Sequence, residues 1–332
     1  MEFSDLGRKI VRELCTDSRI SVTELTTKLG ISRITAAHRI KSLSKELGLT
    51  FTLEINYDSL SFGRFHLLYL NFAKKPKSAE LKHLFADDSV VQLAATTKGD
   101  FDLVIFAITK TSKEYFNWEI KQFVSLAKYG VTLHSSEITI AHLGFLPLDD
   151  EIIQRSDISK IYKDILTALN HNSRMSVREL AKQVGMHEDT ARYHLTKLEN
   201  AKIIRRFTTI ITKSPLRVDI VYFANYAVKE GIEDRIKNER EVMYFKKLNE
   251  IPIASEFQMM FSMTGSEISF TWACYEDERS GFEQSVATHA RMYRVDSPVI
   301  KSAVIVEVIK GIAPIRNIDI KSVYDLSGPG LE

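Results

Sequence analysis

A segment of eight residues occurs twice in this chain of 332 residues. Residues 18–25 read SRISVTEL and residues 173–180 read SRMSVREL, an offset of 155 residues, which is close to half the chain. Both copies continue to a glycine, Gly30 in the first and Gly185 in the second, and then to a basic amphipathic stretch. A repeat of this kind predicts two structural units of one type, each followed by a longer region of different character.

The composition is that of an ordinary globular protein, with 44% hydrophobic and 27% charged residues. Its two cysteines, Cys15 and Cys274, have no metal-ligand spacing and predict neither a disulfide framework nor a metal site. The sequence has no run of about 18 apolar residues and no apolar leader segment, so we expect a cytoplasmic protein with no membrane partner. The net charge of +2 does not by itself indicate nucleic acid, and the distribution of charge must decide.

Three helices are predicted in each repeated unit. Apolar residues recur at helical spacing over residues 6–14 and over residues 161–169, which predicts an amphipathic first helix. In both copies a serine stands three residues before a glutamate, the spacing of a capping box, and this predicts the start of a second helix. Gly30 and Gly185 end that helix, because a tight turn between crossing helices needs a positive φ.

A third helix is predicted to begin near Ser32 in the first copy and near His187 in the second. The buried stripe of this helix is the same in both copies: Ala36, Ile40 and Leu43 in the first, and Ala191, Leu195 and Leu198 in the second. Each third helix leads into β-prone sequence, residues 49–55 and residues 203–212, which predicts a short hairpin or wing. Three helices and a hairpin form a winged helix-turn-helix.

The regions that follow the two winged units have a different periodicity, with alternating strand and helix patterns. In the first half we expect strands at 65–73, 90–96, 101–109 and 133–142, with helices at 79–86 and 113–128. In the second half we expect strands at 221–228, 254–262, 268–275 and 300–309, with helices at 234–248 and 280–293. Both halves therefore follow the βαββαβ order of the ferredoxin-like fold.

The outward side chains of the third helices are polar and predict contact with double-stranded DNA. A helix fits the major groove, where donors near its N-terminal part reach base edges while basic side chains meet phosphates. The residues predicted to contact the groove are Arg33, Thr35, His38 and Arg39 in the first copy and Thr190, Arg192, Tyr193 and His194 in the second. Those predicted to contact phosphate are Lys41, Lys197, Arg205 and Arg206.

Charge supports this interpretation more strongly in the second copy. Residues 159–213 hold eleven basic and five acidic residues, whereas residues 1–50 hold nine and six. Glu188 and Asp189 stand against it, because carboxylates at the start of a recognition helix repel phosphate even though they favour the helix dipole. The alternative is that the charges only keep exposed helix faces solvated.

A family resemblance is carried by residues 24–32 (ELTTKLGIS), by the helix of residues 33–43, and by residues 99–103 (GDFDL). In these segments the chain resembles the Lrp/AsnC (feast/famine) family of bacterial and archaeal regulators, and residues 99–103 look like the family's Gly-Asp-Tyr-Asp turn. The resemblance implies a winged helix followed by a ligand-sensing domain that pairs with a second sensor, either in a homodimer or as a pseudo-dimer within one chain. It also implies an amino acid or other small-molecule effector at Gly99, Asp100 and Asp102.

The second copy departs from that pattern, because its aligned turn, residues 264–267 (TGSE), lacks the second aspartate. A turn between two strands also favours glycine for purely structural reasons, so the first turn need not bind a ligand. The fold class expected is α+β, with two winged helix-turn-helix domains each followed by a ferredoxin-like βαββαβ sensor domain. The predicted boundaries are residues 1–58, 62–146, 159–214 and 218–312 for these four domains, 147–158 for a linker and 313–332 for a tail.

Three functions are compatible with this architecture. The first is a sequence-specific, DNA-binding transcription regulator with two readers per chain. The second is a decarboxylase of sirohaem-type tetrapyrroles, because some proteins of this architecture have that activity and carry a histidine- and tyrosine-rich motif after the second sensor strand. Residues 93–98 and 257–262 hold neither residue type, so we predict no enzyme, no catalytic residues and no cofactor. The third is an interaction scaffold that does not touch DNA.

Overall fold

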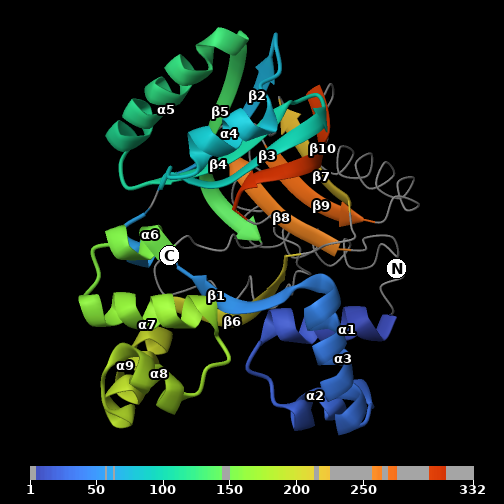
Figure 1. The fold of residues 1–332 in the computed structure, drawn as a ribbon, viewed down its shortest axis with the longest axis vertical. Coiled ribbons are helices and arrows are strands. Elements are labelled where there is room, and N and C mark those ends of the chain that lie inside the picture. The colour runs from blue at the N-terminus through green and yellow to red at the C-terminus, as the bar shows by residue number, and fades with distance from the viewer. Residues whose placement is uncertain are drawn as a thin grey trace, which may run out of the picture.

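The computed structural model describes residues 5–56, 58–62, 64–143, 150–212, 217–224, 256–263, 268–274 and 299–311. Two bodies stand one above the other, as Figure 1 shows: a β-barrel flanked by helices above, and two helix-turn-helix units joined by a two-stranded sheet below. None of the helices within these ranges is long and apolar enough to span a membrane.

The first helix-turn-helix unit consists of α1 (Asp5–Thr16), α2 (Val22–Leu29) and α3 (Arg33–Leu47). As predicted, Ser21 caps α2 by accepting a hydrogen bond from the Glu24 backbone N–H at 3.1 Å. Gly30 ends α2 in the left-handed conformation, at φ 65°. The apolar faces of the three helices meet in one core, which includes Ile10, Leu14, Leu25, Ala36 and Leu43.

The second unit repeats this design with α7 (Lys160–His171), α8 (Val177–Val184) and α9 (Glu188–Asn200). Its capping box is complete: the Glu179 N–H donates to the Ser176 hydroxyl and the Ser176 N–H donates to the Glu179 carboxylate. Gly185 ends α8 at φ 70°, which matches Gly30 in the first unit. The predicted three-helix units are therefore confirmed in both copies.

The predicted hairpins are wrong in one respect. The strand after each unit, β1 (Leu49–Ile55) or β6 (Ile204–Ile211), pairs with the other strand and not with a partner in its own unit. The two strands run antiparallel from Leu49↔Ile211 to Ile55↔Ile204. A lone strand presents unpaired N–H and C=O groups along its edge, and pairing across the two units gives each strand a partner. The result is a ladder that joins the two units.

Equivalent residues of the two units meet across this ladder in a crossed pattern. The Ser18 N–H donates to the Phe207 carbonyl at 2.9 Å, and the Ser173 N–H donates to the Phe51 carbonyl at 3.1 Å. Ser18 and Ser173 themselves, both fully buried, share a hydrogen bond of 2.7 Å between their hydroxyls. Since they stand 155 residues apart, each is the counterpart of the other, and a pseudo-two-fold axis passes between them.

Charged side chains reinforce the same junction. The Arg19 guanidinium lies 3.7 Å from the centre of the Phe207 ring, while Arg174 lies 5.0 Å from the ring of Phe51, its mirrored partner. Burial lowers the pKa of Arg19. This crossed arrangement holds the two units as one body.

The first sensor domain has the predicted order of elements. Its elements are β2 (Arg64–Phe72), α4 (Ser78–Phe85), β3 (Val91–Gly99), β4 (Leu103–Thr109), α5 (Ser112–Leu126) and β5 (Val131–Leu143), with 3-10 turns η1 (Asp58–Leu60) before β2 and η2 (Ala127–Tyr129) after α5. In the second sensor domain the four predicted strands are β7 (Arg217–Ala224), β8 (Glu256–Met263), β9 (Ile268–Cys274) and β10 (Val299–Lys310). Its predicted helices, the turn at 264–267 and the tail lie outside the described residues.

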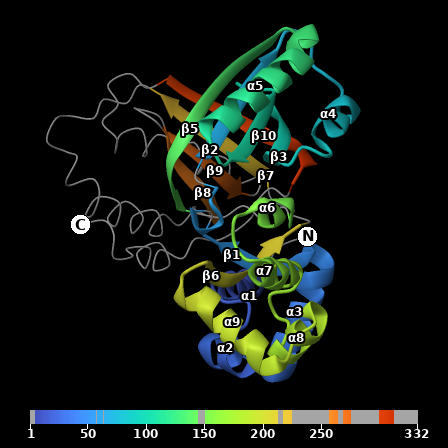
Figure 2. The same cartoon turned by 90° about the vertical axis from the view of Figure 1, so that its left-hand side faces the viewer.

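The strands of both sensor domains close into one eight-stranded antiparallel barrel, in the order β10-β3-β4-β2-β5-β8-β9-β7. Within each domain the fourth strand lies beside the first, and the third separates the first from the second, which is the ferredoxin-like order. Pairing of β5 with β8 and of β10 with β3 joins the two domains (Figures 1 and 2). The sensor pair therefore forms within one chain.

Part of the predicted linker is a helix, α6 (Asp150–Arg155). The periodicity that would reveal it spans less than two turns, but Ile152 and Ile153 are completely buried. Arg155 pairs with Glu114 at the start of α5 and donates to Ser89. This helix therefore fixes the second helix-turn-helix unit against the first sensor domain.

The hydrophobic core follows the same crossed connectivity. One cluster contains Tyr69 and Phe106 of the first sensor domain together with Leu166 and Leu195 of the second helix-turn-helix unit. The first unit has a separate core, against which Ile305 of β10 in the second sensor domain packs. A sensor domain thus shares buried surface with the helix-turn-helix unit of the opposite half.

Removing one partner of the buried ion pair in the ladder should be costly. Arg206 and Glu54 pair with both side chains 11% exposed. We expect Glu54→Ala to lower the free energy of unfolding by about 3 kcal/mol, because it leaves a buried guanidinium without its partner. Urea denaturation monitored by circular dichroism measures this. Glu13→Ala, which breaks the more exposed pair with Lys28, should cost less than about 1 kcal/mol. Equal losses in the two variants would contradict the assignment.

Candidate nucleic-acid interface

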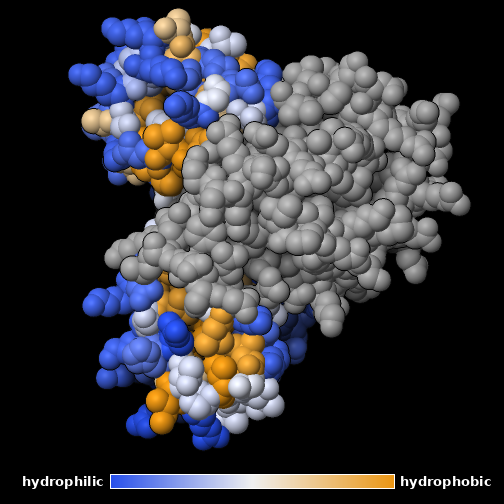
Figure 3. Space-filling model, turned by 90° about the vertical axis from the view of Figure 1, so that its right-hand side faces the viewer, coloured by the Kyte–Doolittle hydropathy of each residue, from blue (hydrophilic) through white to orange (hydrophobic). Residues whose placement is uncertain are grey.

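The two predicted recognition helices lie at the end of the molecule opposite the barrel. In Figure 2 both helix-turn-helix units, which include α3 and α9, form the lower body. Figure 3 shows that hydrophilic side chains dominate the described outer edge of this body and border apolar ones.

The outward face of α3 is exposed and basic. All five of its predicted contact residues lie at the surface: Arg33, Thr35, His38, Arg39 and Lys41. Ser32 caps the helix by accepting a hydrogen bond from the Thr35 N–H at 3.1 Å. The inward face is anchored by Ala36, Leu43 and Leu47, which are buried. The structure thus brings the predicted residues together on one helix with a rigid base.

Two further residues on this helix were missed by the sequence reasoning. Ile34 is 84% exposed, the highest value among the exposed large apolar side chains of the described residues. Lys45 is also exposed on the same helix. The signal for Ile34 is present in the sequence, because it falls outside the buried stripe of α3. An exposed aliphatic side chain beside donors suits contact with a thymine methyl group.

The outward face of α9 differs from that of α3. Thr190, Arg192, Tyr193 and Lys197 are exposed. The fourth predicted groove residue, His194, is only partly exposed, and its ring stands edge-on to Tyr162 of α7, with the ring centres 5.7 Å apart. This contact packs His194 between α7 and α9, and its assignment as a base contact stays a prediction.

The cations of α9 are engaged by their own helix. Arg192 forms an ion pair of 2.8 Å with Glu188 one turn earlier. The Lys197 ammonium lies 4.6 Å from the ring centre of Tyr193, and a hydrogen bond with Tyr193 raises the pKa of Lys197. Both side chains remain largely in solvent, and only the charge of Arg192 is offset by a carboxylate.

Arg205 and Arg206 do not lie on a wing. They belong to β6, in the ladder between the units, where Arg206, with its side chain 11% exposed, pairs with Glu54. Arg205 is half-buried and donates to the Asn56 side chain at 3.3 Å. The predicted phosphate contact of Arg206 is corrected, because its side chain is only 11% exposed and is paired with Glu54. That of Arg205 stays a prediction.

The turn predicted to bind an effector connects the two sensor domains. The Asp100 carboxylate accepts a hydrogen bond from the Ser302 N–H at 2.8 Å, and the Asp100 N–H donates to the Ser302 carbonyl. Gly99 has φ 141°, and a Cβ there would stand 2.3 Å from the same carbonyl oxygen. The glycine is thus required by the close approach of β10.

Asp102, at the end of the same turn, is held by the first sensor domain. Its carboxylate accepts from the Phe72 N–H at 2.9 Å and pairs with Lys75 at 2.6 Å. Both carboxylates of the turn therefore have structural partners, and effector binding at Gly99, Asp100 and Asp102 stays a prediction.

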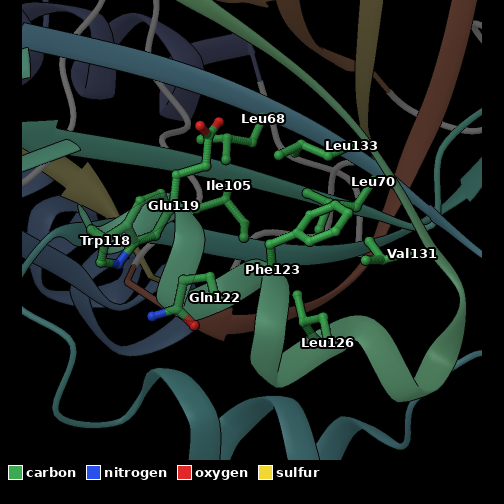
Figure 4. A pocket seen from close by; sticks show the side chains of 10 residues that line it. All are labelled: Leu68, Leu70, Ile105, Trp118, Glu119, Gln122, Phe123, Leu126, Val131 and Leu133. Atoms are coloured by element: carbon green, nitrogen blue, oxygen red, sulfur yellow. The ribbon is translucent and has the colours of Figure 1, made fainter. Parts of the chain in front are cut away.

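One small apolar cavity lies between α5 and the sheet of the first sensor domain (Figure 4). It encloses about 10 Å³, which is barely the space of one water molecule. Its lining consists of Leu68, Leu70, Ile105, Trp118, Glu119, Gln122, Phe123, Leu126, Val131 and Leu133. Such a space is too small for an effector. Within the described ranges, no three side chains of the metal-binding types come together.

The helix-turn-helix units match known DNA-binding proteins. Residues 3–46 and 158–205 both match a family described as winged helix-turn-helix DNA-binding. An uncharacterised helix-turn-helix-type transcriptional regulator of Pyrococcus furiosus is 31% identical over 128 residues, which cover 38% of this chain and 84% of the relative. The transcriptional regulator Ptr1 of Methanocaldococcus jannaschii is 35% identical over 103 residues, covering 31% of this chain and 69% of Ptr1.

Among solved structures, the siroheme decarboxylase NirDL has the same fold. The superposition covers 96% of both chains with a TM-score of 0.57 and 12% sequence identity. At that identity the likeness concerns the fold alone. The fold and the two matched units define a DNA-binding transcription regulator of the winged helix-turn-helix class. Within that class, the chain belongs to the Lrp/AsnC (feast/famine) family of helix-turn-helix regulators, and it carries the family's DNA-binding unit twice.

Substitution of Gly99 tests the junction between the sensor domains. We expect Gly99→Ala to lower the free energy of unfolding by about 3 kcal/mol, since the added methyl group collides with the Ser302 backbone. Gly30→Ala is the matched control, because it also has positive φ but no atom within 4 Å of the new Cβ. That variant should lose only about 1–2 kcal/mol. Thermal unfolding measures both, and equal losses would show that β10 does not press on Gly99.

Proposed function

We propose that this regulator binds double-stranded DNA in a sequence-specific manner, with α3 placed in the major groove. The observation that carries the proposal is the exposed row of Arg33, Thr35, His38 and Arg39 on a helix whose other face is anchored in a hydrophobic core. Rigid anchoring matters because base readout needs donors held at fixed positions.

The side chains of α3 suit distinct tasks in the groove. Arg33 and Arg39 carry the forked donors that recognise guanine O6 and N7. Thr35 hydrogen-bonds either base type, and Lys41 neutralises phosphate farther along the helix. The N-terminus of α3 adds the positive end of the helix dipole, which favours a nearby phosphate.

A single chain is proposed as the DNA-binding unit, because the pairing that a homodimer would supply is made within the chain by the ladder and the barrel. Half-sites read by two such helices lie about one helical turn apart, or a multiple of it. If α9 also entered a groove, its half-site would differ in sequence, since the outward residues of α3 and α9 differ. We expect such a protein to act at the chromosome, in the cytoplasm.

An amino acid or another small-molecule effector is proposed as the modulator of DNA binding. The support is the family resemblance of the Gly99–Asp102 turn, and the position of that turn between the sensor domains would let a ligand act on their junction. Isothermal titration with the standard amino acids tests this, and an absence of heat for all of them would reject an amino acid effector.

We also propose that the chain is not a tetrapyrrole decarboxylase. Residues 93–98 and 257–262, which correspond to the motif of such enzymes, contain no histidine or tyrosine. Incubation with iron-bound sirohaem should therefore yield no decarboxylated product.

Binding to random duplex DNA should depend steeply on salt. Each phosphate neutralised by lysine or arginine releases counterions, so affinity should fall at least about tenfold when salt rises from about 50 to 200 mM. Fluorescence anisotropy with a labelled duplex measures this. A flat and weak response at low salt would favour the scaffold function.

Removal of a predicted base contact should weaken specific binding more than non-specific binding. We expect Arg39→Ala to reduce affinity for a selected site by about tenfold or more, equivalent to about 1–3 kcal/mol. Lys113→Ala is the control, because Lys113 is exposed on α5 of the sensor domain, away from α3. Loss of affinity in both variants alike would show that α3 is not the reading helix.

A further inference from the structure

The two recognition helices occupy equivalent places, but their first turns carry opposite charge. At the offset of 155, Arg33 of α3 corresponds to Glu188 of α9, and Ile34 corresponds to Asp189. The next residue is threonine in both helices. The contrast therefore falls on the part of the helix that approaches base edges most closely.

The contrast extends along both helices. α3 contains four basic residues and one acidic residue, whereas α9 contains two basic and three acidic residues. Most basic residues of the second unit lie outside α9, and two of them, Arg205 and Arg206, belong to the ladder strand β6. The larger basic surplus that the sequence shows for the second unit is thus absent from α9 itself.

The contacts of α9 reduce its attraction to DNA further. Arg192 is paired with Glu188 at 2.8 Å, so its charge is compensated before DNA arrives. Both first-turn acids are exposed, and within the described part of the chain neither has a basic partner outside α9. In a groove they would face phosphates on both sides, where like charges repel.

Carboxylates can also read DNA, because aspartate and glutamate accept a hydrogen bond from cytosine N4. Glu188 is occupied by Arg192, however, and α9 offers no free arginine beside it to offset phosphate repulsion. The observations therefore favour exclusion of α9 from the groove over cytosine reading.

We infer that the two units have separate tasks, with α3 reading the bases and α9 remaining off the DNA. This inference rests on the proposed function. Arg33 and Ile34 set the specificity of α3, through a guanine-type contact and a thymine-methyl contact. Because the ladder fixes the two units as one body, the molecule tilts about α3 and one chain protects a single half-site.

Exchange of the first turns tests the inference. The probe is a duplex selected by the wild-type chain from a random library, extended to carry a second copy of the half-site about one helical turn away. We expect the wild type to protect one half-site in hydroxyl-radical footprinting. E188R/D189I, which gives α9 the first turn of α3, should protect both half-sites and bind about tenfold more tightly. R33E/I34D should abolish protection.

Two control variants show whether the change in binding depends on where the charge is altered, and melting curves show whether each variant is folded. D87R adds positive charge at an exposed site on the first sensor domain and should leave the footprint unchanged. E188Q/D189N removes the repulsion with isosteric side chains and should raise affinity by a smaller factor. Circular dichroism melts establish that each variant is folded.

The possible results are distinct. Protection of two half-sites by the wild type, or a loss of affinity in E188R/D189I, would overturn the inference, and the second result would indicate cytosine reading by α9. Failure of the wild type to bind any selected duplex would instead reject the proposed function itself.

Discussion

The antiparallel ladder of β1 and β6 is the interaction on which the rest of the molecule depends. Each strand leaves its own helix-turn-helix unit and finds its backbone partners in the other. The serine hydroxyls at the centre and the arginines stacked on Phe207 and Phe51 close this junction from both sides. A ladder alone would allow twisting, but buried contacts on both faces restrict it. The two helix-turn-helix units are therefore held at a fixed separation as one body.

The barrel makes a second junction of the same kind. Four strands from each half close into one ring, so that no sensor edge is left unpaired among the strands described. Crossed packing links the two levels, because the first sensor domain shares its core with the second helix-turn-helix unit through α6. Continuous buried packing thus connects the first sensor domain to the second helix-turn-helix unit below it.

Much of this fold follows from local sequence. Capping serines, the glycines at positive φ and the repeated apolar stripe define the helices, and alternation defines the strands. The pairing of distant strands cannot be predicted in this way, because the sequence of a strand of seven or eight residues does not indicate which other strand it pairs with. This is why Arg206 was placed at a wing and lies in the ladder. The α6 helix was not predicted because its six residues are too few to show a helical repeat of apolar positions. Ile34 was not predicted because DNA contacts are usually sought among polar side chains, and Ile34 is aliphatic.

The contact between Ser18 and Ser173 has a consequence for how such a chain changes over time. In a dimer of separate identical subunits, a residue on the axis meets its own copy, so one altered codon alters both sides of the contact. Here the two sides are encoded at different places in one gene. Either half can therefore change its outer surface while the buried contacts between the halves stay the same. Because both halves belong to one chain, a changed half always pairs with the same partner half. The two halves of one chain can therefore diverge into different, permanently paired domains.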